Sequence, residues 1–190
     1  YKDIAFGPSN MGLSKGETFD RIHKALSFVG LSEDILEKSP FEISGGQKRR
    51  VAIAGVIAME PEVLILDEPT AGLDPKGRNE ILSHLKNYHR ENNKAVIIIS
   101  HSMDEIASNV QRVIVMNKAK IAMTGTVREI FNNSEKLSDM GLAVPQITSI
   151  FSKLKKAGFD VDTSVFTARQ AADEILRYME NNNIDIVQSV

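Results

Sequence analysis

The sequence contains no cysteine, which excludes disulfide bonds and thiolate metal sites and fits a reducing compartment. It also lacks an excess of one charge. The formal net charge is only -2, so no overall field attracts nucleic acid or an anionic membrane. We therefore expect no nucleic-acid partner.

Long hydrophobic runs are absent as well. The longest, from Val51 to Met59, is interrupted by Gly55 and is far shorter than the roughly 20 residues that span a bilayer. The chain begins at Tyr1 without a signal peptide, so we expect it to be a piece of a longer parent protein. With 42% hydrophobic and 25% charged residues, its 190 residues suit one globular domain with a small appendage.

The most informative stretch is centred on the adjacent acids Asp67 and Glu68. The apolar run at 63–66 predicts a strand buried on both faces of a parallel sheet, so both acids lie at the strand's carboxyl end, where such sheets bind ligands. Neighbouring residues on a strand point to opposite sides, so one acid can bind Mg²⁺ while the other faces another group, such as an attacking water. By itself, however, this pattern more often marks an ordinary strand end with solvated charges.

A second informative stretch is Ser44-Gly45-Gly46-Gln47, which precedes a helix that is apolar almost all round at 51–58. The two glycines let a phosphate approach the backbone, and the free amides and positive dipole of a helix start favour an anion. The alternative is a serine-capped core helix that follows a glycine turn.

Capping patterns locate the other helices. Serine or threonine is followed three residues later by glutamate or glutamine at Ser14–Glu17, Ser102–Glu105, Thr126–Glu129 and Thr167–Gln170. Asp74 followed by Pro75 opens a further helix over 76–92, on which we expect His84 and His89 to be solvent-exposed.

The remaining segments suggest strands, a linker and a helical tail. The run at 95–99 predicts a second buried strand ending at Ser100-His101, where a histidine alone would be an ordinary loop residue. Segments 112–116 and 120–124 predict a β-hairpin, and the polar stretch at 132–136 predicts a linker. The tail carries apolar stripes that can pack on each other, on the core or on a second copy: Ile147, Ile150, Phe151 and Leu154, then Ala172, Ile175, Leu176 and Met179.

Four motifs in this order and spacing resemble those of the ATP-binding cassette (ABC) ATPases. They are Ser44-Gly45-Gly46-Gln47 as signature motif, Asp67-Glu68 as the end of Walker B with its catalytic glutamate, Ala71-Gly72-Leu73-Asp74 as D-loop, and Ser100-His101-Ser102 as switch histidine. Within that family, residues 1–8, 50–56, 59–75 and 145–147 most resemble the ATPase subunits of energy-coupling-factor importers, the cobalt, nickel and vitamin transporters. The resemblance covers essentially the whole chain.

The resemblance implies an α/β fold, a partial P-loop NTPase core with mainly parallel strands and added helical parts. Residues 1–60 would form the helical signature subdomain, and residues 61–132 the C-terminal half of the ATPase core. Residues 133–190 would form a linker and a small helical extension.

The resemblance also implies a mechanism for the parent, which would bind ATP and Mg²⁺ and work as a head-to-tail dimer. In it, Ser44, Gly45, Gly46 and Gln47 would contact the ATP held by a second ABC ATPase subunit, identical or different. Glu68 would be the general base toward water, Asp67 would hold Mg²⁺ through its water shell, and His101 would touch the γ-phosphate. Asp74 would couple the two sites.

Further partners follow from the resemblance. They are a transmembrane coupling subunit and a substrate-binding membrane subunit, which place the parent at the cytoplasmic face of the cell membrane. The parent would power uptake of cobalt or another micronutrient.

The sequence departs from the family because it has no Gly-x-x-x-x-Gly-Lys-Ser/Thr loop, the Walker A motif. Gly7 and Gly12 have the right spacing, but no lysine follows and no strand precedes them. We therefore expect these residues alone neither to hydrolyse ATP nor to bind it tightly. One alternative is a chromosome or repair ATPase, although sustained heptads and a basic face are missing. Another is a non-catalytic dimerisation or interaction module.

Overall fold

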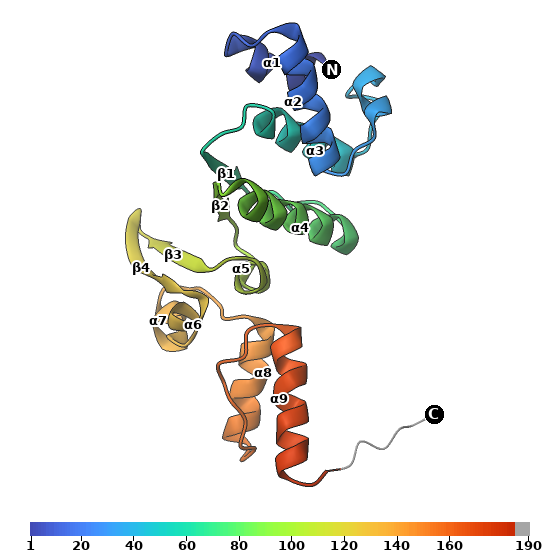
Figure 1. Cartoon of the computed structure of the whole chain (residues 1–190). Helices are drawn as coiled ribbons and strands as arrows, with labels where there is room; N and C mark the ends of the chain where they lie inside the picture. The colour runs from blue at the N-terminus through green and yellow to red at the C-terminus, as the bar shows by residue number, and fades with distance from the viewer. Residues whose placement is uncertain (185–190) are drawn as a thin grey trace. The chain divides into compact units, whose positions relative to one another are not determined.

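In the computed structural model, which describes residues 1–184, the chain folds into two compact units (Figure 1). The first runs from Tyr1 to Ser100, and the second begins at His101. The fold is that of an α/β protein with one parallel and one antiparallel strand pair among the described residues.

The first unit combines helices with the parallel strand pair. Its elements are α1 (Lys2–Asn10), α2 (Lys15–Phe28), the 3-10 helix η1 (Glu33–Glu37), α3 (Gly45–Ile57), β1 (Val63–Asp67), α4 (Pro75–Asn92) and β2 (Ala95–Ile99). Ser14 and Glu17 form the expected capping box at the start of α2. Gly7 lies within α1 and Gly12 just beyond it, so this segment is a helix and its end rather than a phosphate loop.

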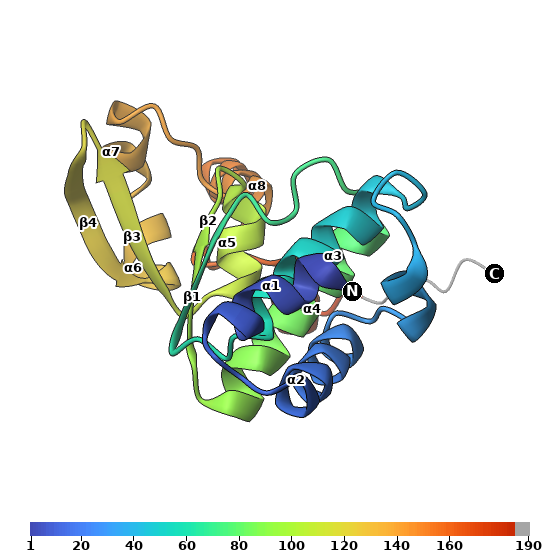
Figure 2. The same ribbon diagram turned by 90° about the horizontal axis from the view of Figure 1, so that it is seen from above.

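The core of the first unit lies among its helices and one face of its sheet. Helices α1, α2 and α3 pack side by side (Figures 1 and 2). Ile22, Ala54 and Leu64 are fully buried, and α4 adds the buried side chains of Leu85 and Tyr88. This core fixes α3 and β1 with respect to each other, which matters because both lead to candidate site residues.

Strands β1 and β2 pair in parallel, with Leu64 opposite Val96 and Asp67 opposite Ile99. The expectations that β1 is buried on both faces and that β2 is a buried strand are both wrong. Val63 and Ile65 on β1 are 50% and 61% exposed, while Ile97 and Ile99 on β2 are 46% and 50% exposed. Alternation along the strands turns these side chains away from the core, and no helix of residues 1–100 covers that face.

Two further expectations for the first unit are corrected. Helix α3 is not buried all round, because Ala52 and Val56 are exposed. His84 and His89 are partly buried instead of solvent-exposed. The Nδ1 atom of His89 lies 2.8 Å from the Lys94 carbonyl oxygen, while burial and the neighbouring charge of Arg50 lower the pKa of His84.

The second unit begins with a helix and a hairpin and ends with helices. Its elements are α5 (Met103–Asn109), β3 (Arg112–Asn117), β4 (Lys120–Thr126), α6 (Val127–Phe131), α7 (Ser134–Asp139), α8 (Gln146–Lys156) and α9 (Ala168–Asn181). The hairpin is confirmed, and its turn places Lys118 and Ala119 at φ values of 49° and 58°. The linker expected at 132–136 is wrong, because the chain turns into α7 there.

The second unit has two separate hydrophobic clusters. Phe131, Leu137 and Phe166 belong to the first, and Phe151 and Val165 to the second. Helix α9 contributes Ala171 and Tyr178 to the second cluster, whereas part of its apolar stripe points outward. Ile175 and Leu176 on that stripe are 46% and 45% exposed.

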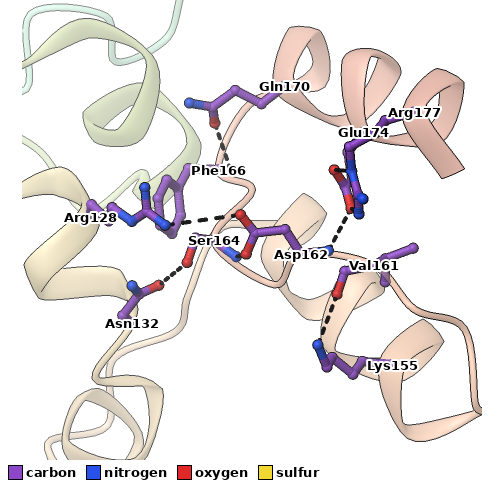
Figure 3. A network of polar contacts seen from close by, with 10 residues as sticks. All are labelled: Arg128, Asn132, Lys155, Val161, Asp162, Ser164, Phe166, Gln170, Glu174 and Arg177. Atoms are coloured by element: carbon purple, nitrogen blue, oxygen red, sulfur yellow. Dashed lines mark hydrogen bonds and ion pairs between the residues drawn. The ribbon is translucent and has the colours of Figure 1, made fainter.

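A polar network ties α9 to the loop that precedes it (Figure 3). Arg177 donates from Nε and Nη2 to the Glu174 carboxylate at 2.7 and 2.5 Å, and the same carboxylate accepts the Asp162 backbone N–H at 2.5 Å. Asp162 also lies 4.0 Å from Arg128 of α6. Although burial opposes it, mainly the Arg177 hydrogen bonds lower the pKa of Glu174 to about 2.

Candidate functional site

The turn after β1 carries the two candidate acids. Asp67 is the last residue of the strand and is exposed at its carboxyl end. Glu68 follows at φ 45°, and its backbone N–H donates to the Ile99 carbonyl oxygen at 2.9 Å. Because Glu68 has left-handed backbone geometry outside the strand, strand alternation does not set its direction, contrary to our expectation. Such a conformation costs on the order of 1–3 kcal/mol for a residue other than glycine, so the surroundings must hold it.

Arg49 of α3 binds this turn. Its Nε donates to the Pro69 carbonyl oxygen at 3.0 Å, and its Nη2 donates to the Glu68 carbonyl oxygen. Together with Lys48 and Arg50, this residue completes the family pattern after Gln47, but its contact with the turn could not be read from the sequence. Its position in the basic run at 48–50 marks it as cationic, but nothing in that run shows that it reaches a turn 20 residues away.

The signature turn forms the beginning of α3. The Ser44 hydroxyl accepts the Gln47 N–H at 3.2 Å, and the Gln47 Oε1 accepts the Ser44 N–H at 2.9 Å. Both polar side chains therefore make a capping box. This agrees with the alternative interpretation of the stretch, in which Ser44 caps a core helix after a glycine turn. Gly45 is exposed, with open space where a side chain would lie. The first amides of a helix lack intrahelical partners, so the turn offers donors and a positive helix end to an anion.

The D-loop residues continue the turn from Glu68 to α4. The Ala71 N–H donates to the Glu68 carbonyl oxygen at 3.2 Å, and Gly72 adopts a left-handed φ of 75°. The Asp74 Oδ1 accepts the Gly77 N–H at 2.9 Å, so this carboxylate caps α4 as expected. The structure brings the signature turn to the D-loop, because a Cβ on Gly46 would lie 3.6 Å from Leu73 Cδ2.

His101 is the first residue of the second unit and is exposed. It precedes Ser102, whose hydroxyl accepts the Glu105 N–H at 3.4 Å and caps α5, as predicted. The convergence of His101 with Asp67 and Glu68 around one ligand stays a prediction.

Asp67 presents a single exposed carboxylate at the end of β1. Among residues 1–184, no three His, Cys, Asp or Glu side chains are grouped to hold a metal ion. A single exposed carboxylate is what Mg²⁺ needs when it keeps several waters and takes further ligands from phosphates.

The described helices include none that is long and apolar enough to cross a membrane.

A shallow surface depression lies elsewhere in the first unit, between α2 and α4. Its lining includes His23, Lys24, His84 and Glu91, none of which is a candidate site residue. Since the candidate residues lie on exposed turns, this depression gives no argument about the proposed chemistry.

The chain is similar in sequence and in fold to ABC transporter proteins. Residues 5–71 match the family model described as ABC transporter. The energy-coupling factor transporter ATP-binding protein EcfA2 of Caldanaerobacter subterraneus is 52% identical over 94% of this chain and 63% of its own length. The chain thus spans a little under two thirds of the length of this relative.

Solved structures give the same fold. The structure of cbiO1 from Clostridium perfringens, part of the ABC transporter complex cbiONQ, aligns with a TM-score of 0.63 and 38% identity, covering 83% of this chain and 59% of that one. The ATP-binding cassette MJ0796, in a dimeric post-hydrolysis state bound to ADP and Pi, aligns with a TM-score of 0.54 and 29% identity over 60% of this chain and 49% of that one. Both are cassette ATPase folds, in agreement with the predicted fold class.

Proposed function

The chain belongs to the family of ABC transporter ATP-binding proteins, and we propose that it forms the signature, Walker B and D-loop part of the ATPase subunit of an energy-coupling-factor importer. The parent would bind and hydrolyse ATP as a dimer with a second ATPase subunit. The similarity to EcfA2 over 94% of the chain supports this assignment. The observation that carries it is the Asp67-Glu68 turn, held in a defined geometry at the carboxyl end of a parallel strand.

In the proposed reaction, a water oxygen bonds to the γ-phosphorus of ATP while the bond to the β–γ bridging oxygen breaks. The Glu68 carboxylate accepts a proton from that water, and ADP and phosphate are released. The His101 imidazole donates a hydrogen bond to a γ-phosphate oxygen. Phosphoryl transfer depends mainly on positioning and charge stabilisation, so the hydrogen bonds that hold the Glu68 turn bear on the reaction.

Asp67 would hold Mg²⁺ through water molecules, and the bound ion would neutralise charge on the β- and γ-phosphate oxygens. The exposed carboxylate at the end of β1 is consistent with this role.

The signature turn would contact the nucleotide of the partner subunit. Gly45 and Gly46 would present backbone N–H groups to the γ-phosphate, and Ser44 and Gln47 would shape the turn through their capping box. Asp74 would couple the two sites, since it lies where the D-loop enters α4.

These 190 residues alone would neither hydrolyse ATP nor bind it tightly, because they contain no Walker A loop. A titration of the isolated chain with ATP and Mg²⁺ should show no micromolar binding. An affinity of about 1 µM, roughly 8 kcal/mol of binding free energy, would contradict this.

The parent would lie at the cytoplasmic face of the cell membrane, bound to a transmembrane coupling subunit. A separate substrate-binding membrane subunit would select the solute, cobalt or another micronutrient. Closure of the ATPase dimer would push on the membrane subunits.

The direct test replaces Glu68 by glutamine in the full-length protein. Turnover should be lost while ATP still drives dimer formation, because glutamine keeps the shape of the side chain but accepts no proton. Glu62→Gln is a matched control, since Glu62 precedes the other end of β1 and pairs with Lys94. Unchanged turnover in Glu68→Gln would remove the catalytic assignment.

A second candidate is a non-catalytic dimerisation module, which the outward apolar stripe on α9 favours. Under this alternative, the full-length protein would dimerise without ATP and hydrolyse none. Loss of dimers in Leu176→Asp together with absent turnover in the unaltered protein would support the module over the motor.

A further inference from the structure

We propose that Arg49 is a positioning residue that holds the Glu68 turn in its reactive shape and makes that shape depend on the signature helix of the same chain. The inference rests on the proposed role of Glu68 as the base. It assigns a task to a residue of the basic run that follows the signature motif.

The hydrogen bonds around Glu68 constrain both of its backbone dihedrals. On one side, its N–H is bound to the Ile99 carbonyl oxygen of β2 at 2.9 Å. On the other, its carbonyl oxygen accepts from Arg49 Nη2. With both peptide planes held, the residue is kept at φ 45°, from which the backbone would otherwise relax to negative φ.

Arg49 also binds Pro69, the residue after Glu68. Arg49 Nε donates to the Pro69 carbonyl oxygen at 3.0 Å, and the ring of Pro69 fixes its own φ. One guanidinium thus binds two successive carbonyls along one edge. The planar fork of arginine is suited to such paired acceptors, whereas lysine presents a single point charge that cannot match the two directions in this way.

The two Arg49 hydrogen bonds to the Glu68 and Pro69 carbonyls, here called the clamp, come from a helix that is packed into the core. Arg49 is partly buried on α3, five residues after the Ser44 cap, and α3 is fixed in the core by Ile53 and Ala54. The first turn of the same helix also lies against Leu73. A displacement of α3 when its first turn contacts a nucleotide would therefore be passed to the Glu68 carbonyl.

Arg50 provides a matched comparison. It has the same charge and is adjacent on α3, but its guanidinium pairs with Glu80 of α4. If the charge of α3 were what mattered, both arginines would be equivalent. If the clamp matters, only Arg49 affects the reaction.

The test uses ATPase kinetics of the full-length protein. Arg49→Met should lower kcat about 10- to 100-fold with KM for ATP changed less than twofold, because a misplaced base affects the chemical step more than binding. Arg49→Lys should give an intermediate kcat, and Arg50→Met should keep kcat within about twofold. An unchanged kcat in Arg49→Met would overturn the proposal, and so would full activity of Arg49→Lys if the methionine variant fails to fold.

A second measurement needs no catalysis. Hydrogen exchange at the Glu68 and Ala71 amides should be at least about 10-fold faster in Arg49→Met, and unchanged in Arg50→Met. Equal exchange in Arg49→Met and the unaltered protein would overturn the clamp. If the unaltered protein hydrolyses no ATP, or Glu68→Gln leaves turnover intact, the proposed function fails. If both behave as expected and Arg49→Met has normal kcat, only the inference about Arg49 fails.

Discussion

The two units use arginine in different ways. In the first, the Arg49 guanidinium donates to two backbone carbonyls of the turn in which Glu68 has positive φ. In the second, Arg177 pairs with the Glu174 carboxylate, and the pair ties a helix to its preceding loop (Figure 3). The first arrangement fixes the backbone of a turn, whereas the second fixes a carboxylate on a helix.

The units also differ in how their cores are built. The first has one cluster that joins helices to one face of the sheet, whereas the second divides its apolar side chains between two small clusters. Because each unit has hydrophobic clusters of its own, we expect a substitution in one unit to destabilise that unit and leave the other unchanged. Substitutions in each unit test that prediction.

Phe151→Ala should destabilise the second unit by about 3–5 kcal/mol, because it empties the centre of the α8–α9 cluster. Phe151 is 2% exposed, whereas the adjacent Ile150 is 50% exposed and provides the control Ile150→Ala. Hydrogen exchange resolved by residue should show faster opening in α8 and α9 only. Equal destabilisation of α2 and α3 would show that the two units unfold together.

Leu64→Ala should destabilise the first unit by about 2–5 kcal/mol, since the Leu64 side chain is fully buried on the covered face of the sheet. Its neighbour Ile65 is 61% exposed, so Ile65→Ala should cost less than about 1 kcal/mol. Chemical denaturation followed by exchange in β1 measures both. A similar loss in the two variants would mean that the exposed face of the strand is covered in solution.

Glu174→Gln should remove a pH-dependent part of the second unit's stability. The pKa of Glu174 is about 2 in the folded state and 4.5 in the absence of its partners. The stabilisation is therefore complete above about pH 4.5 and is lost as the pH falls toward 2. Because Arg177 is 48% exposed and solvent screens the pair, we expect only about 1–2 kcal/mol.

The measurement is the free energy of unfolding between pH 2 and 6. The unaltered chain should lose stability in α9 on acidification more steeply than Glu174→Gln. Parallel curves would show that the Arg177 pair contributes nothing to the pH dependence.

Short-range features of the fold could be predicted from the sequence. The capping boxes at Ser14, Thr126 and Thr167 were predictable because the bonds join residues three apart. The hairpin at 112–126 was predictable for a similar reason, since its turn joins adjacent strands.

Features that depend on distant residues could not be predicted. The apolar composition of β1 shows that it is a strand but not that only one face is covered, since burial depends on helices elsewhere in the chain. The candidate acids were found from their motif, but the Arg49 clamp was not. Its bonds join α3 to a turn 19 and 20 residues further along, and a basic run does not indicate which carbonyl an arginine reaches.

The central claim is that Asp67, Glu68 and His101 act on one triphosphate. It is tested most directly by a structure of the full-length Glu68→Gln variant with ATP and Mg²⁺. In that structure we expect Asp67 next to the hydrated Mg²⁺, His101 on the γ-phosphate and Arg49 still bound to the carbonyls of residues 68 and 69. Asp67 and His101 on separate surfaces, away from the nucleotide, would contradict it.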